Sequence, residues 1–180
     1  IGVGLVGSEM CIRDRSSSTE NDIWCRHVLD SAQLVKYIDS NKFKSLSDLG
    51  TGAGFPGIIL SIFFSDVISF HVKLYEKSNV KIDFLKEQIQ KLNLNNVSLY
   101  DNDYQSHKLS SDYFVFRAFK KLHEILRISR ETITGPHKLI VMMRKSAQDQ
   151  LNKASKADIN KYKLVPSITS KDSKILLLDA

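Results

Sequence analysis

Cysteine and long hydrophobic runs are scarce in this sequence of 180 residues, and internal repeats are missing. Its two cysteines, Cys11 and Cys25, have neither the spacing of a zinc-binding pair nor that of a C-x-x-C redox motif. No apolar run approaches the roughly 18 residues that a membrane-spanning helix needs, and the stretch at residues 58–64 is far too short. We therefore expect a soluble protein of the reducing cytoplasm, with no metal site and no disulfide framework.

The first fifteen residues also lack the charged start, the apolar stretch and the cleavage site of a signal peptide. Residues 4–15 resemble translated adapter sequence that contaminates some environmental sequence collections. We therefore expect residues 1–15 to be non-native and residues 16–180 to form the domain. The alternative is a native glycine-containing arm, in which residues 16–19 would be a flexible joint.

Composition indicates an ordinary globular protein. Hydrophobic residues make up 42% of the chain, which is long enough for one compact α/β domain. The 26 Lys and Arg against 20 Asp and Glu give a formal charge of +6, which favours a phosphate-bearing partner such as nucleic acid. The alternative is a basic surface that only contacts solvent.

Hydrophobic periodicity predicts an α/β protein. Apolar residues spaced three and four apart predict an amphipathic helix over residues 20–39, ahead of a core at residues 45–180. In that core short apolar runs alternate with helical stretches, which indicates a mostly parallel sheet with helices on both faces. The seven predicted strands are 45–49, 69–75, 97–100, 113–116, 139–143, 162–165 and 175–178, and the predicted helices are 56–64, 79–92, 121–131 and 147–156. The last two strands have no helix between them, so we expect an antiparallel pair at the sheet edge.

A glycine-rich segment, D-L-G-T-G-A-G-F-P-G at residues 48–57, follows the first predicted strand. Gly50, Gly52 and Gly54 lie where the backbone must turn sharply and let a ligand approach without a Cβ in the way. Pro56 suits a first helical turn, where its missing amide hydrogen is no loss. The segment predicts a nucleotide-like site at a strand-to-helix turn.

An acidic residue, Glu76, follows the second predicted strand, nineteen positions after Gly57. This is the range in which a carboxylate accepts the ribose hydroxyls of a bound nucleoside. The alternative is a carboxylate that complements the dipole of the helix starting near Asn79. The two roles are compatible.

These features fit either a dinucleotide or S-adenosylmethionine. A dinucleotide needs a helix N-terminus open to pyrophosphate, whereas S-adenosylmethionine carries a sulfonium cation and no phosphate. Asp48, directly before the glycines, would repel pyrophosphate and suits a cationic ligand. The alternative for Asp48 is a carboxylate that bonds the loop amides and holds the turn.

Three strings together resemble one known family: R-H-V-L-D-S at residues 26–31, the glycine segment at 48–57, and R-A-F at 117–119. They are similar to the bacterial small-subunit ribosomal RNA guanine-N7 methyltransferases, historically called glucose-inhibited division protein B. The resemblance implies a Rossmann-like class I fold that uses S-adenosylmethionine on 16S ribosomal RNA of the small ribosomal subunit. Family members carry a further N-terminal helical segment, so we expect the chain to be truncated there.

The resemblance also implies site residues. Gly50 and Phe55 line the methyl donor, and Arg117 lies between donor and substrate. An adenine contact falls on Tyr104 and Gln105, although the family usually has R-A-E there. A second departure follows the fifth strand, where the family tends to have L-K-G and this chain has Met142-Met143-Arg144-Lys145.

Methylation at guanine N7 uses a ring nitrogen with a free lone pair, so it needs no general base, and in-line positioning would supply the catalysis. Arg117 is the expected catalytic residue, because a planar guanidinium suits guanine O6, an RNA phosphate or the donor carboxylate. The alternative for Arg117 is an ion pair between elements.

RNA is expected at the carboxyl ends of the strands. His27 and Asp30 share a helix face and would contact substrate or only pack. Arg127 and Arg130 are expected on a solvated helix face. The predicted phosphate contacts are Lys120, Lys121, Arg144 and Lys145.

Three other functions stay open at this point: a methyltransferase with another acceptor, a non-catalytic RNA-binding module and an NAD-dependent oxidoreductase. We expect a monomer.

Overall fold

The structure is a computed structural model and describes residues 23–144, 147–154 and 162–180. The adapter-like segment, the serines after it, Cys11 and the first residues of the predicted N-terminal helix lie outside these ranges. Within the described ranges no helix is both long and apolar enough to cross a membrane.

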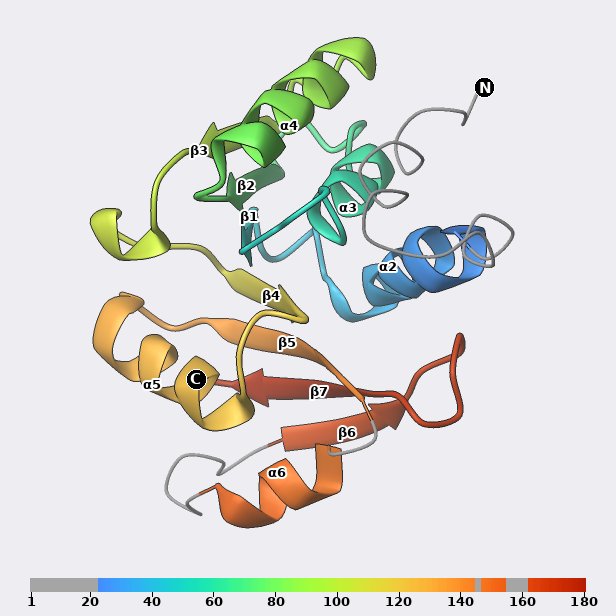
Figure 1. The fold of residues 1–180 in the computed structure, drawn as a ribbon, viewed down its shortest axis with the longest axis vertical. Helices are drawn as coiled ribbons and strands as arrows, with labels where there is room; N and C mark the ends of the chain where they lie inside the picture. Colours follow the sequence, from blue (N-terminus) through green and yellow to red (C-terminus); the bar gives the residue numbers. More distant parts are fainter. Residues whose placement is uncertain (1–22, 145–146, 155–161) are drawn as a thin grey trace.

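One seven-stranded sheet organises the chain, in the order β3-β2-β1-β4-β5-β7-β6 (Figure 1). Its strands are β1 (Ser45–Leu49), β2 (His71–Tyr75), β3 (Val97–Tyr100), β4 (Tyr113–Arg117), β5 (Lys138–Met143), β6 (Tyr162–Pro166) and β7 (Lys174–Asp179). The first five are parallel, whereas β7 runs antiparallel to β5 and β6. All seven predicted strands are therefore confirmed, within two residues at each end, and so is the antiparallel pair at the edge.

The strand order reverses at β1, which pairs with β2 on one side and β4 on the other. In doubly wound sheets such a reversal opens a crevice at the carboxyl ends of the strands, where ligands bind. The central strand β4, Y-F-V-F-R, is buried along its first four residues. A continuous apolar run of this kind is typical of a parallel strand covered on both faces.

Helices cover both faces, as predicted. The helices after the glycine segment are α3 (Gly57–Phe63), α4 (Asn79–Lys91), η4 (Tyr104–Ser106), α5 (Leu122–Thr132) and α6 (Ala147–Lys153). One core cluster packs α5 and α6 on the sheet, and a second packs α3, α4 and the N-terminal helical segment on the other face. The result is a three-layered Rossmann-like fold.

The N-terminal helical segment differs from the single regular helix that the spacing predicts. It consists of a π-helical turn, η2 (Trp24–Leu29), a short α-helix, α2 (Asp30–Ala32), and a 3-10 helix, η3 (Gln33–Tyr37). Single π-helical turns are rare and occur often at functional sites. Here the π turn contains His27 and ends beside Asp30, and Figure 1 shows α2 next to α3, which follows the glycine segment.

Candidate active site

The glycine loop, residues 50–57, leaves β1 in a conformation that only glycine adopts easily. Gly50, Gly52 and Gly54 have φ of 70°, 64° and 90°, in the left-handed region where a Cβ is strained. The amides of Gly50 and Thr51 both donate to the carbonyl of Tyr75, at 2.9 and 3.1 Å. The end of β2 therefore holds the loop at the reversal of strand order.

Asp48 holds the other side of the glycine loop. Its side chain is 1% exposed, and Oδ2 accepts the Thr51 hydroxyl at 2.6 Å and the Gly57 amide at 2.9 Å. Burial raises the pKa of Asp48 to about 6, against the lowering effect of these hydrogen bonds and of nearby Arg117. These contacts are those of a carboxylate that holds the turn, and a direct contact with a cationic ligand stays a prediction.

Glu76 connects β2 to the glycine loop and to α4. Its Oε2 accepts the Gly52 amide at 3.0 Å, and Oε1 accepts the amides of Lys77 and Ser78, each at 3.0 Å. The carboxylate thus serves the start of α4, one of its two expected roles. Within the described residues Oε2 accepts one hydrogen bond, from Gly52, and has a second lone pair, so the geometry also fits the other role, binding of ribose hydroxyls.

Open space lies in front of Gly52, where a Cβ would meet only the Gly50 carbonyl oxygen, at 4.0 Å. A Cβ on Gly50 would instead lie 2.5 Å from the ring of Phe119, which contacts Tyr104 edge-on at 5.5 Å between ring centroids. The Phe119 ring therefore packs between Gly50 and Tyr104, beside the glycine loop. The adenine contact expected for Tyr104 stays a prediction. Sequence reasoning did not assign a role to Phe119, although it stands in the R-A-F string.

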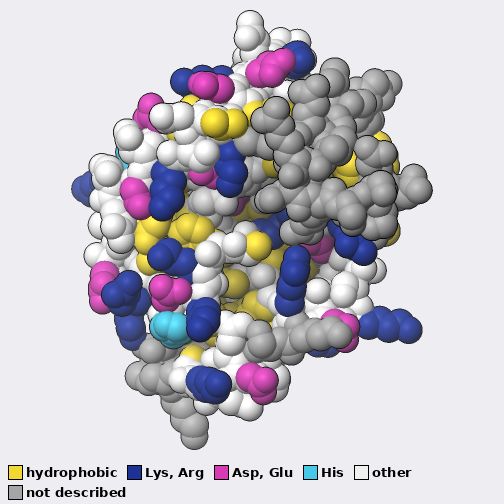
Figure 2. All heavy atoms as spheres, in the orientation of Figure 1, with side chains coloured by type: hydrophobic (Ala, Val, Ile, Leu, Met, Phe, Trp, Pro, Cys, Tyr) yellow, Lys and Arg dark blue, Asp and Glu magenta, His cyan; other side chains and the backbone are white. Residues whose placement is uncertain are grey.

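A pocket of about 840 Å³, here called the edge pocket, lies at the carboxyl ends of β4 and β5. It is connected to the glycine loop through His27, which lines the pocket and whose ring contacts the ring of Phe55. The N-terminal helical segment and the loop between β6 and β7 complete its wall. Figure 2 shows a hollow near the centre of the visible face, with hydrophobic side chains in it and Lys and Arg side chains around it.

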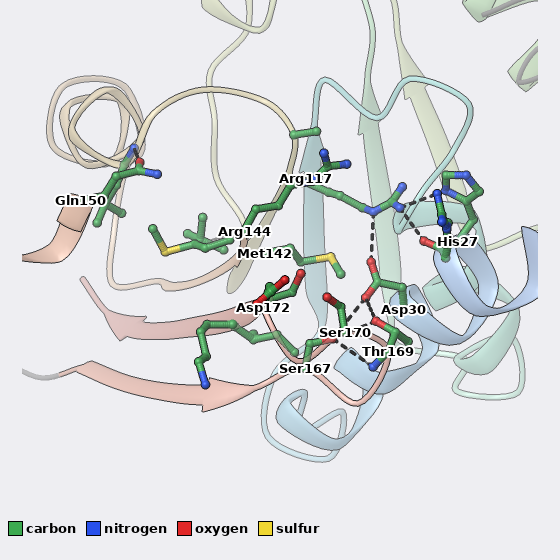
Figure 3. Close-up of a pocket in the computed structure, with 18 of the residues that line it drawn as sticks. His27, Asp30, Arg117, Met142, Arg144, Gln150, Ser167, Thr169, Ser170 and Asp172 are labelled. Atoms are coloured by element: carbon green, nitrogen blue, oxygen red, sulfur yellow. Dashed lines mark hydrogen bonds and ion pairs between the residues drawn. The ribbon is translucent and has the colours of Figure 1, made fainter. Parts of the chain in front are cut away.

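Arg117 extends from the end of β4 along the wall of the edge pocket toward the N-terminal helical segment (Figure 3). Its Nη2 donates to the Arg26 carbonyl at 2.7 Å and to His27 Nδ1 at 2.9 Å, and its Nε lies 3.4 Å from Asp30 Oδ2. Burial lowers the pKa of Arg117, and the Asp30 carboxylate opposes that shift. The ion pair between elements, given above as the alternative, is therefore present within the pocket wall itself.

His27 joins the edge pocket to the glycine loop. Its ring lies 5.2 Å from the ring of Phe55, centroid to centroid, while its Nδ1 contacts Arg117. A guanidinium has only donors, so Nδ1 is the acceptor in this contact. The prediction that His27 and Asp30 share a helix face is confirmed, since both contact Arg117.

Asp30 is held by Gln33 and by the loop between β6 and β7, partners that sequence reasoning did not find. Its Oδ1 accepts Thr169 Oγ1 at 2.5 Å and Gln33 Nε2 at 2.8 Å. The same Gln33 amide donates to Ser167 Oγ at 3.1 Å, and its Oε1 accepts the Ile168 amide at 3.0 Å. Figure 3 shows the side chains of Asp30, Ser167 and Thr169 converging below Arg117.

The other predicted residues are spread more widely. Lys120 and Arg144 line the edge pocket, whereas Lys121 is exposed outside its lining and Lys145 lies outside the described residues. Gln105 is exposed beside buried Tyr104. The exposure expected for Arg127 and Arg130 on α5 is confirmed. In the described parts of the chain no cluster of three or more His, Cys, Asp or Glu side chains could hold a metal ion.

Sequence comparison gives a family. The sequence model of rRNA small subunit methyltransferase G matches residues 14–177. The chain is 36% identical over 152 residues to the ribosomal RNA small subunit methyltransferase G of Pelagibacter ubique, covering 84% of this chain and 71% of that one. It is 38% identical over 160 residues to the protein of the same name from Rickettsia bellii, covering 89% and 79%.

Structure comparison supports the fold. A SAM-dependent methyltransferase from Aquifex aeolicus superposes with a TM-score of 0.63 at 15% identity, covering 90% of this chain and 94% of that one. M. jannaschii TYW2, solved in complex with AdoMet, has a TM-score of 0.60 at 16% identity and covers 86% and 75%. At these identities the likeness concerns the fold alone.

Proposed function

The chain belongs to the rRNA small subunit methyltransferase G family, and from this premise we propose that it methylates N7 of a guanine in 16S ribosomal RNA with S-adenosylmethionine as the donor. The observation that carries the proposal is the edge pocket, which has Arg117 and His27 in its wall and is joined to the glycine loop by the contact of His27 with Phe55. Donor and acceptor sites that adjoin at the carboxyl ends of the strands are what a direct group transfer requires.

The glycine loop fits the donor. Open space in front of Gly52 leaves room for a ligand against the backbone, and Glu76 Oε2 is positioned to accept hydroxyl groups. Tyr104 and Phe119 provide aromatic surface beside Gly50 for a purine. S-adenosylmethionine bound there supplies an electrophilic methyl group on a sulfonium.

No side chain has to remove a proton in this reaction, because guanine N7 carries its lone pair in the plane of the ring. The state of His27 agrees with this, since its Nδ1 accepts from Arg117 and is thereby unavailable as a base. Catalysis then depends on holding the purine in line with the methyl group at near-attack distance. The Arg117 side chain, which lines the pocket, donates to guanine O6 and so orients the base.

The decisive experiment incubates the protein with methyl-labelled donor and small ribosomal subunits from cells that lack the modification. We expect one equivalent of label in 16S RNA, at a guanine that becomes sensitive to borohydride and aniline, as N7-methylated guanine does. Free 16S RNA, large subunits and bulk protein serve as the alternative acceptors. Label in one of those, or in the small subunit at an atom other than N7, would contradict the proposal.

We also propose that the protein acts as a monomer in the cytoplasm, where its ribosomal substrate lies. The domain proposed for this activity is residues 16–180. Size-exclusion chromatography with light scattering should give one species of single-chain mass, and a dimer at assay concentration would contradict this point.

A further inference from the structure

We propose that Asp30 is a positioning residue for the methyl transfer: it holds the Arg117 guanidinium against the pocket wall and neutralises its charge, so that the edge pocket tolerates the positive charge that the reaction places on the purine. The inference rests on the proposed function, because only methylation of a neutral ring nitrogen such as N7 creates a cationic base.

Methyl transfer to N7 moves a positive charge onto the purine. The N7 lone pair forms the new N–CH₃ bond, the C–S bond breaks, and its electron pair stays on sulfur. One positive charge therefore moves from the sulfonium to the purine, and no proton is released. In the transition state part of that charge already lies on the ring, next to whatever the pocket wall presents.

Among the cations that line the pocket, Lys120 and Arg144 included, Arg117 is about four-fifths buried, with 20% of its side chain exposed. A guanidinium that donates to the base is useful for orientation, but its own charge repels the charge that develops on the ring. The repulsion is strong where water is largely excluded. An adjacent carboxylate reduces it, and Asp30 Oδ2 lies 3.4 Å from Arg117 Nε.

The position of the Asp30 carboxylate is itself determined by neutral donors. The Thr169 hydroxyl and the Gln33 amide bind Oδ1, and the Ser167 hydroxyl lies at 3.4 Å from the same oxygen. These contacts leave Oδ2 for Arg117. None of the three partners carries a charge, so none of them offsets the charge that Asp30 presents to the guanidinium. Asp48 adds to the effect of Asp30 on Arg117, and Arg144 opposes it.

The same contacts explain why the arrangement is more than an ordinary surface ion pair, which contributes little. Arg117 has three partners on one short helical segment: the Arg26 carbonyl, His27 and Asp30. Together they determine both the rotation and the direction of the guanidinium plane. Asp30 alone among them supplies a negative charge.

The test compares Asp30→Asn with wild type in the small-subunit assay under saturating RNA and donor. The amide keeps the shape and an acceptor oxygen but loses the charge, so we expect kcat to fall about 30- to 100-fold while KM for RNA changes less than threefold. Donor affinity, measured by calorimetry without RNA, should stay within threefold. Asp30→Glu should recover at least part of kcat, because it restores the charge.

Two further variants separate this role from a structural one. In an Arg117→Met background the Asp30→Asn change should have little additional effect on kcat, because there is no guanidinium left to neutralise. Asp179→Asn removes the ion pair between Lys138, at the start of β5, and Asp179, at the end of β7. This pair lies at the opposite end of the strands from the pocket, so the variant should leave kcat unchanged.

The outcomes are distinct. If the wild-type protein itself does not methylate N7, the proposed function fails. If wild type is active and Asp30→Asn keeps kcat within twofold, or if the Asp30 and Arg117 effects simply add, the inference about Asp30 is wrong. A loss of kcat that only follows a lower melting temperature, with no recovery in Asp30→Glu, would overturn it as well.

Discussion

The glycine loop and the edge pocket both lie at the carboxyl ends of the strands and meet where His27 contacts Phe55. The contacts that stabilise them, however, join residues at very different separations along the chain. In the glycine loop Asp48 bonds Thr51 and Gly57, three and nine residues away, and Glu76 bonds Gly52, 24 residues away. In the edge pocket Arg117 contacts His27 across 90 residues, and Thr169 contacts Asp30 across 139. The glycine loop, the proposed donor side, is held by contacts within one part of the chain, whereas the edge pocket, the proposed acceptor side, is assembled from distant segments.

The difference implies that the two regions respond differently to mutation. Changes in the glycine loop should alter the fold or donor binding, because the loop is part of the buried centre of the sheet. Changes in the edge pocket should alter turnover with a smaller effect on stability, because its wall consists of side chains that meet at the surface of the core. Four predictions test this contrast.

The largest effect is expected for Gly57→Ala. The new Cβ would lie 2.2 Å from Leu74 Cδ2 and 2.8 Å from Asp48 Oδ2, and both side chains are buried. Overpacking of this kind should lower the free energy of unfolding by about 3 kcal/mol, measured by urea denaturation. Gly52→Ala, whose Cβ meets open space, is the comparison, and an equal loss in both variants would contradict the steric explanation.

Asp48 should make stability depend on pH. Its folded pKa is about 6, against 3.8 for the unaltered carboxyl, so the folded state binds the proton more tightly than the unfolded state. The contribution of the protonated Asp48 to the free energy of unfolding is therefore complete below pH 3.8 and is lost as the pH rises through about 6. Between pH 4 and 7 the wild type should lose about 2 kcal/mol relative to Asp48→Asn, measured by denaturation at each pH. Parallel curves for the two proteins would contradict this assignment.

Gly52→Ala should affect the donor site more than the fold. Its Cβ would project into the open space in front of the loop, so we expect affinity for S-adenosylmethionine to fall at least about tenfold, or 1.4 kcal/mol, by calorimetry. Gly135→Ala is the matched control, because Gly135 also has a positive φ, 83°, and open space around it, but lies in the turn before β5. Donor binding that falls equally in both variants would show a general effect of backbone strain.

The smallest effect is expected for Gln33→Ala in the edge pocket. The variant removes the amide that joins Asp30, Ser167 and Ile168, so unfolding free energy should fall by about 1 kcal/mol and kcat by a few-fold. Gln105→Ala removes an exposed amide and should change stability by less than about 0.5 kcal/mol. If unfolding free energy fell as little in Gln33→Ala as in the control, the hydrogen bonds of Gln33 would not hold the loop between β6 and β7.

Range of contact also explains how far the sequence predicts this molecule. The strands and the glycine loop depend on local patterns, such as the apolar run of β4 and the glycines that need a positive φ. Glu76 could be located because its distance along the chain follows from the strand-helix-strand unit. Asp30 was noticed only for its spacing from His27, and Thr169 has no local pattern at all. Their contact joins segments that are 139 residues apart in the sequence, and hydrophobic periodicity does not encode such a contact.

The type of helix in the N-terminal segment also cannot be predicted from the sequence pattern. Amphipathic spacing indicates a helix but does not distinguish an α turn from the π turn at Trp24–Leu29. The assignment of Asp48 remained open between ligand and loop for a related reason, since burial to 1% depends on how α3 and β2 pack over it.

The antiparallel insertion of β7 between β5 and β6 has a consequence for protein synthesis. It brings the turn that contains Ser167 and Thr169 back to the carboxyl ends of the parallel strands, where Thr169 contacts Asp30, a residue that is synthesised much earlier. A nascent chain has the residues of the glycine loop, Glu76, Tyr104 and Phe119 before it has those of the last wall of the edge pocket, which begins at Ser167. The growing protein would therefore acquire the proposed means to bind a methyl donor before the means to use one.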